Sequence, residues 1–264
     1  MAKKVSASVS GKLEMLKGIE LATKAQQAVT SLYKKEKHIN PFEPKYLSVH
    51  CDEILYNLVT TEYELYKVEE KRAHIDPLWL LFKGKIPNNA KLTEKEIEIL
   101  VRERFDDLRD FFLSISQSRK SRAGGSFQYH IDHILTTLNY PHDSQKIIDG
   151  KPDFILPKAE LYHKNPGECI LITAKRTLRE RWREVITEGK KSPHYFLMTV
   201  DTKPSQNLMQ EMADNRISLV VPSPIIAQIP AYKKFSNVIT FKGLLDDYVA
   251  PAMKRWKQKG IIKK

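Results

Sequence analysis

Apolar residues recur at three- and four-residue steps through most of the first 118 positions, which is the period of an amphipathic helix. We expect three long helices, at about 12–37, 44–73 and 94–112. Thr93 precedes the third and Glu96 follows three residues later, a spacing typical of a capping box. We expect the stretch at 76–82 to form a packed connection. We therefore expect the first 118 residues to form a helical layer that serves scaffolding, dimerisation or DNA wrapping rather than catalysis.

Short apolar runs alternate with helical segments after about residue 150. Strands are expected at 154–156, 169–173, 195–200, 218–221 and 238–241, and helices at 178–189, 205–214 and 244–257. This alternation predicts a mixed β-sheet flanked by helices. We therefore expect an α/β (α+β) fold, divided into a helical N-terminal domain at 1–118 and a catalytic domain at 119–264.

A short basic stretch, Arg119-Lys120-Ser121-Arg122-Ala123-Gly124-Gly125, joins these halves. We expect it to form a flexible turn, after which Ser126 caps a helix at 127–138. Its cations suit phosphate contact or insertion into a DNA groove, although an ordinary exposed loop has the same composition. On the following helix Gln128 and Asp132 are four residues apart and share one face.

The chain has a formal net charge of +12, from 44 basic and 32 acidic residues. This balance favours a polyanionic partner such as nucleic acid or an anionic membrane surface, though a generally basic protein is equally compatible with it. No apolar run approaches the roughly 20 residues that span a bilayer, and the start lacks an apolar signal core. We expect no membrane partner, a cytoplasmic protein, and buried thiols at Cys51 and Cys169, which fit no metal-ligand spacing.

Three residues in the second half can converge on one point. Asp153 opens the first expected strand, Lys175 ends the second, and Glu188 lies on the helix that follows. Two carboxylates can bind a divalent metal through oxygen. A lysine beside them can position or deprotonate a water and offset phosphate charge. The pattern predicts a metal-dependent phosphodiesterase.

Arg179, Glu180 and Arg181 fall in the first turn of that helix. An arginine pairs with guanine O6 and N7 and a carboxylate accepts from cytosine N4, so the triplet can read G·C-rich DNA. A run of charged residues such as this one more commonly forms salt bridges on the solvated face of a helix.

Together these residues resemble the CCGG/CCNGG family of restriction endonucleases, which includes the EcoRII catalytic domain. The family has a permuted PD-(D/E)xK site whose acidic residue lies 13 positions after the lysine, and here 188 − 175 = 13. Thr173 stands where the ordinary pattern has an acid. The triplet at 179–181 matches the family's recognition triplet. The segment from Arg119 to Arg122 resembles one whose first arginine works in the minor groove.

The resemblance implies a restriction-endonuclease fold and a type II enzyme that cuts double-stranded DNA with Mg²⁺. Asp153 and Glu188 would bind the metal and Lys175 would act on the water. It further implies a homodimer or higher oligomer, a palindrome containing CCGG and 5′-phosphate ends. A CCWGG target, a repair or junction nuclease, and a DNA-binding module without catalysis remain alternatives.

One residue departs from the family pattern. The helix after the basic stretch usually brings a glutamate to the active site, and position 128 is glutamine. We expect Asp132, one turn later, to substitute as an outer-sphere or second metal ligand.

Overall fold

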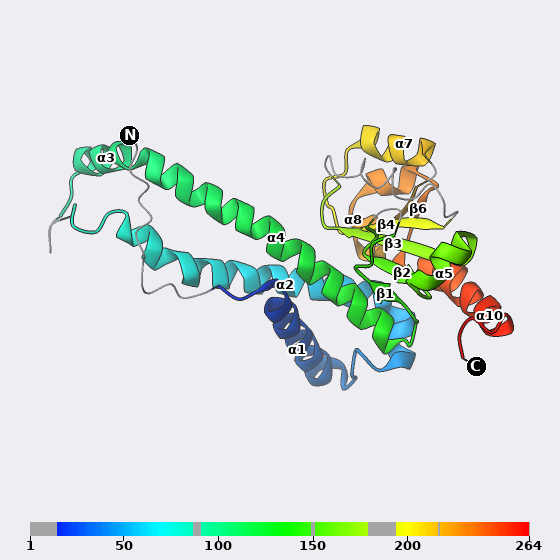
Figure 1. Ribbon diagram of the computed structural model, residues 1–264. Helices are drawn as coiled ribbons and strands as arrows, with labels where there is room; N and C mark the ends of the chain where they lie inside the picture. Colours follow the sequence, from blue (N-terminus) through cyan, green and yellow to red (C-terminus); the bar gives the residue numbers. More distant parts are fainter. Residues whose placement is uncertain (1–14, 87–90, 149–150, 179–193, 216, 264) are drawn as a thin grey trace.

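The computed structural model describes residues 15–86, 91–148, 151–178, 194–215 and 217–263. Its first half is a long helical arm that projects from one side of a sheet-containing body (Figure 1). The arm and its base are formed by α1 (Gly18–Lys37), α2 (Pro44–Leu80), α3 (Glu94–Glu103) and α4 (Phe105–Thr137). Helices α2 and α4 run side by side along the arm, with α3 at its far end (Figure 1).

The arm helices differ from the sequence-based prediction at two boundaries. Helix α2 continues to Leu80 with Pro77 inside it, where a packed connection was expected. The expected third helix is divided at Arg104 (φ −103°, ψ 8°) into α3 and α4. The capping box is confirmed, because the Thr93 hydroxyl accepts from the Glu96 N–H and the Glu96 carboxylate accepts from the Thr93 N–H at 2.8 Å.

The prediction of a basic turn at 119–126 is wrong, because α4 runs through this segment without a break. Two glycines in a helix cost about 1 kcal/mol each relative to alanine. Buried Ile115 and Phe127 anchor the helix on either side. Helix α1 also crosses it so closely that a Cβ on Gly18 would lie 2.7 Å from the Arg122 carbonyl oxygen. Tertiary packing therefore overrides the local turn signal, and Ser126 lies inside the helix instead of capping it.

A mixed sheet of six strands forms the centre of the body, in the order β1-β2-β3-β4-β5-β6. The strands are β1 (Asp143–Ser144), β2 (Phe154–Leu156), β3 (Ile170–Lys175), β4 (Tyr195–Thr199), β5 (Ser218–Val220) and β6 (Val238–Ile239). Strands β1, β2 and β3 pair antiparallel, and β3 to β6 pair parallel. The expected α/β class is confirmed; β1 was not expected.

Alternate strand residues face two separate cores, as the two-residue period of a strand requires. One core joins the sheet to α1, α2, α4 and the C-terminal helices, which are α9 (Phe241–Gly243), a π-helical turn (Leu244–Val249) and α10 (Ala250–Gln258). The other joins it to α5 (Ala159–Lys164), α7 (Gln206–Asp214) and α8 (Ser223–Gln228), with short 3-10 turns at 166–168 and 230–234. Cys51 and Cys169 are both buried, as expected.

Asp52 fixes the base of α2 to the body. Its buried carboxylate accepts backbone N–H groups from Ser223 (3.1 Å), Phe241 (2.9 Å) and Lys242 (3.0 Å). Burial raises the pKa of Asp52, while these three hydrogen bonds favour its ionised form. The division at 118/119 lies inside α4, and the two domains stay a prediction. Within the described residues, no helix is both long and apolar enough to cross a bilayer.

Candidate active site

Asp153 and Lys175 meet at the junction of β2 and β3. Asp153 directly precedes β2, Lys175 is the last residue of β3, and Phe154 pairs with Ile172 in the antiparallel register. The Lys175 ammonium lies 3.9 Å from Asp153 Oδ2. Asp153 is 5% exposed, whereas the Lys175 side chain is 28% exposed. The lysine is thus open to a ligand while the carboxylate is held inside the fold.

Three N–H donors from separate elements hold the Asp153 carboxylate. The Ala174 N–H donates to Oδ2 at 2.7 Å. The Gln128 amide, on α4, donates to Oδ1 at 2.6 Å, and the Gln145 amide donates to the same oxygen at 3.0 Å. A carboxylate that accepts several such bonds is stabilised in its ionised form.

The residue that α4 brings to Asp153 is Gln128. Asp132, predicted as its substitute, accepts hydrogen bonds from His142 at 3.1 Å and Ser144 at 2.9 Å, and its side chain is 40% exposed. These contacts tie α4 to β1. A role for Asp132 as an outer-sphere or second metal ligand therefore stays a prediction, one that its contacts in the structure do not support.

Thr173, at the position of the missing acid, is buried, and its hydroxyl is 2.7 Å from the Tyr195 hydroxyl on β4. It follows that Thr173 joins two parallel strands here. The predicted metal ligand Glu188 and the predicted recognition residues Arg179, Glu180 and Arg181 lie outside the described residues.

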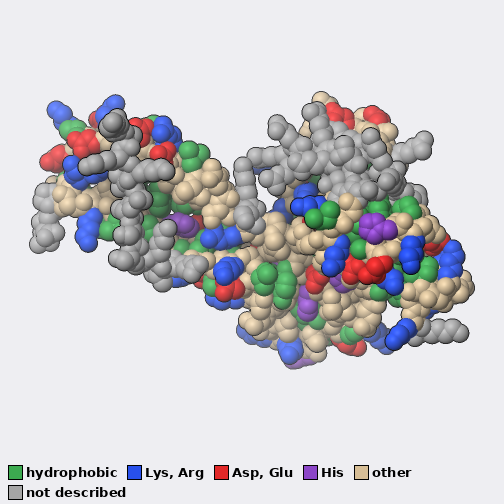
Figure 2. All heavy atoms as spheres, viewed as in Figure 1, with side chains coloured by type: hydrophobic (Ala, Val, Ile, Leu, Met, Phe, Trp, Pro, Cys, Tyr) green, Lys and Arg blue, Asp and Glu red, His purple; other side chains and the backbone are tan. Residues whose placement is uncertain are grey.

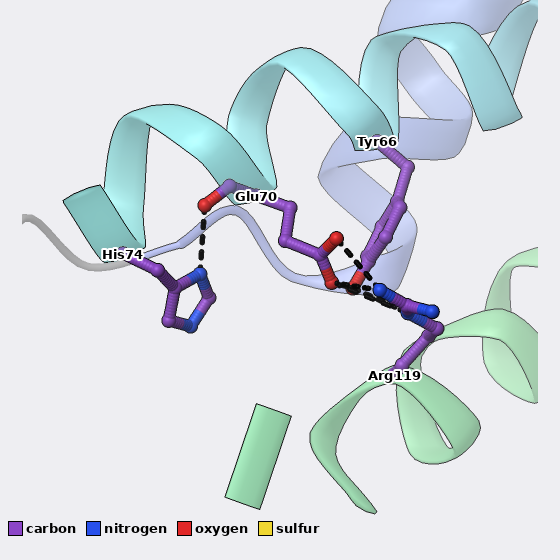
Figure 3. A network of polar contacts seen from close by, with 4 residues as sticks. All are labelled: Tyr66, Glu70, His74 and Arg119. Carbon is purple, nitrogen blue, oxygen red and sulfur yellow. Dashed lines mark hydrogen bonds and ion pairs between the residues drawn. The ribbon is translucent and has the colours of Figure 1, made fainter. Parts of the chain in front are cut away.

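Arg119 is engaged with α2 (Figure 3). Its guanidinium donates to both oxygens of Glu70, at 2.8 and 2.7 Å, and to the Tyr66 hydroxyl at 3.3 Å. Burial raises the pKa of Glu70, but hydrogen bonds from Arg119 and Tyr66 outweigh it and the pKa is lowered overall. Arg122 donates to the Ser118 hydroxyl one turn earlier. Their DNA-binding roles stay predictions, and Arg119 would have to exchange Glu70 for a phosphate or base.

A buried polar cluster, which sequence reasoning missed, lies directly beside the lysine. Glu62 of α2 accepts from Ser126 (2.7 Å) and Arg176 (3.0 Å) and is paired with His130 (2.8 Å). Glu62 is 3% exposed and His130 is fully buried. Burial lowers the pKa of Arg176, and the Glu62 charge opposes that effect. Arg176 follows Lys175 in the chain, so this cluster fixes the end of β3 to the arm.

The donor set suits a hard divalent cation. Asp153 supplies carboxylate oxygen, and the Gln128 amide beside it carries a neutral oxygen, both of which Mg²⁺ accepts. The described residues alone contain no cluster of three or more His, Cys, Asp or Glu side chains that could hold a metal. Glu188 is the further acidic ligand that the sequence predicts.

Comparisons with known proteins identify the family and the fold of the chain. A family model described as EcoRII C terminal matches residues 88–245, which is more than half of the chain. The type II restriction enzyme EcoRII of Escherichia coli is 32% identical over 162 residues, covering 57% of this chain and 40% of that protein. The type II restriction enzyme SsoII of Shigella sonnei is 32% identical over 149 residues, covering 52% and 48%. The chain thus spans less than half the length of these curated relatives.

A solved structure of metal-depleted Ecl18kI in complex with uncleaved, modified DNA superimposes with a TM-score of 0.75. The two chains are 22% identical, and the match covers 94% of this chain and 82% of the other. This likeness shows that the fold is that of the restriction endonucleases.

Proposed function

Because the chain belongs to the EcoRII C terminal family, we propose that it is a type II restriction endonuclease that cuts double-stranded DNA at one short sequence. The observation that carries the proposal is the Asp153–Lys175 pair, 3.9 Å apart at the junction of two strands. The formal charge of +12 supports binding of a polyanion. Both curated relatives are type II restriction enzymes by name.

We further propose Mg²⁺ as the cofactor, held by Asp153 and Glu188. When bound, it polarises the phosphate and lowers the pKa of water. Asp153 keeps a fixed orientation through its three N–H donors. Lys175, the last residue of β3, has a partly exposed side chain, which positions or deprotonates the attacking water and offsets charge on the phosphate. In-line attack then leaves 5′-phosphate and 3′-hydroxyl ends.

The proposed target is a palindrome containing CCGG, read by Arg179, Glu180 and Arg181. This choice follows the resemblance of the sequence motifs to those of BsaWI within the family. A symmetric target cut in both strands needs two active sites, so we propose a two-fold homodimer or a higher oligomer. Large apolar side chains exposed on the arm support self-association, among them Trp79 (56%), Phe105 (62%) and Phe112 (55%). Figure 2 shows apolar side chains among charged ones on the arm's visible surface.

The test is to incubate the protein with plasmid DNA and Mg²⁺, beside Lys175→Ala, and to sequence the fragment ends. We expect discrete fragments from the wild type alone, all ending at one palindrome with a CCGG core. Fragments that end at CCWGG would support the proposed endonuclease activity but overturn the proposed CCGG target. Cutting at structured DNA without one sequence would indicate a repair or junction nuclease. DNA binding without cleavage under several divalent metals would overturn the enzymatic proposal.

A further inference from the structure

Gln145 follows β1 directly and contacts Asp153 twice. Its backbone N–H donates to the Asp153 carbonyl oxygen at 3.0 Å, and its side-chain amide donates to Asp153 Oδ1 at 3.0 Å. Its φ is +56°, in the left-handed region that residues other than glycine seldom adopt. A residue held in this conformation by two hydrogen bonds to one neighbour indicates a local structure built around that neighbour.

We propose that Gln145 is a positioning residue of the metal site, which orients both the Asp153 carboxylate and the Gln128 amide for the cation. The inference rests on the proposed function, because it concerns the same site. It adds a residue for which the sequence motif gives no signal.

The two N–H groups of the Gln145 amide serve two different acceptors. One bonds to Asp153 Oδ1, and the other bonds to Gln128 Oε1 at 3.0 Å. An ionised carboxylate only accepts hydrogen bonds, so the Gln128 Nε2 must face Asp153. Gln145 then fixes the oxygen end of the same amide. The three side chains form a closed triangle in which each side is a hydrogen bond of 2.6 to 3.0 Å.

This triangle distinguishes the two carboxylate oxygens. Oδ1 faces the two glutamines, whereas Oδ2 faces the Ala174 N–H and the Lys175 ammonium. Without Gln145 one lone pair of Oδ1 loses its donor, and the Gln128 Oε1 loses the N–H group that holds it. Loss of a group that orients a metal ligand typically lowers metal affinity or activity by about 10- to 100-fold.

Gln145→Gly removes the amide and suits the positive φ, so it separates positioning from folding. Asn139→Gly is the matched control, because Asn139 also has a positive φ of 57°. Binding of Mn²⁺ to the DNA-free protein is measured by the electron paramagnetic resonance of free Mn²⁺. DNA affinity without divalent metal, the single-turnover cleavage rate and the urea midpoint are measured on the same samples.

We expect Gln145→Gly to bind Mn²⁺ about 10-fold more weakly and to cleave at least about 10-fold more slowly. Metal-free DNA affinity should be unchanged and the urea midpoint equal or higher, and Asn139→Gly should match the wild type in metal binding and cleavage. Wild-type Mn²⁺ affinity in Gln145→Gly would overturn the inference. If Gln145→Gly is unstable, the same measurements are made on Gln145→Met. Methionine keeps the length of the side chain but has no hydrogen-bond donor, so its Mn²⁺ affinity decides whether the inference holds. A wild type that binds Mn²⁺ but cuts no DNA would overturn the proposed function, while the Mn²⁺ comparison still decides the role of Gln145.

Discussion

Replacing Glu62 tests whether the buried cluster stabilises the attachment of the arm to the end of β3. Glu62 is the acceptor for Ser126 and Arg176 and the partner of His130. In Glu62→Gln the side chain keeps its shape, but a neutral amide replaces the carboxylate that faces Arg176. The Arg176 guanidinium, whose side chain is only 17% exposed, then has no opposing carboxylate at this position.

We expect Glu62→Gln to lose much stability for a substitution that only replaces a carboxylate with an amide. Removing one partner of a buried ion pair costs about 3–5 kcal/mol. With a urea slope of roughly 3 kcal/mol/M for a chain of this size, the midpoint should fall by roughly 1 to 2 M. Glu64→Gln is the matched control on the same helix, because the Glu64–Lys67 pair is 60% and 49% exposed. An exposed pair of this kind contributes only about 0–1 kcal/mol.

The assay is urea unfolding of both variants, followed by a double variant in which Arg176→Met accompanies Glu62→Gln. Arg176→Met removes the guanidinium charge that Glu62→Gln leaves buried without an opposing carboxylate, so the double variant should recover most of the lost stability. The reasoning is refuted if Glu62→Gln loses no more stability than Glu64→Gln, or if Arg176→Met fails to compensate.

Three further predictions concern neighbouring contacts. Because the pKa of Glu70 is lowered overall, its pairing with Arg119 contributes above the ordinary glutamate pKa of 4.5 and is lost as pH falls through the lowered folded value. Glu70→Gln should therefore cost about 1 kcal/mol at pH 7 and nothing in strong acid, as thermal unfolding across pH would show. Gln128→Glu places a second carboxylate against Asp153, so it should lower the unfolding temperature in EDTA and tighten Mn²⁺ binding, both measurable on the purified variant. Asp52→Ala leaves three backbone N–H groups without their acceptor, that of Phe241 in a buried hydrogen bond and those of Ser223 and Lys242 in partly buried ones, and should cost about 3 kcal/mol in urea unfolding.

Much of the fold could be predicted because apolar runs and the spacing of apolar residues are local features of the sequence. The runs at 154–156 and 195–199 are almost wholly apolar, and the structure buries every residue in them. Asp153 and Lys175 could be placed because each lies at the end of such a run, so predicting the strands also located the two side chains. The motif spacing and the strand pattern thus point to the same two residues.

The rest depends on contacts between distant parts of the chain. Residues 119–126 have the composition of a turn, and the buried anchors Ile115 and Phe127 together with the close crossing of Gly18 over Arg122 explain why they are helical. Glu62 and Arg176 are 114 positions apart, and no periodicity connects them. Gln145 gives no signal at all, because its importance arises from a positive φ and from two hydrogen bonds to Asp153.

Helix α4 connects these observations. Within ten residues it carries Arg119, which pairs with α2, then Ser126, which bonds to Glu62, and Gln128, which bonds to Asp153. At 1.5 Å per residue these contacts span about 14 Å along one rigid element. One continuous helix thus carries both Arg119, which is proposed to contact DNA, and Gln128, which bonds to the proposed metal ligand Asp153. The packing that keeps α4 helical through residues 119–126 therefore also places the Gln128 amide against the Asp153 carboxylate.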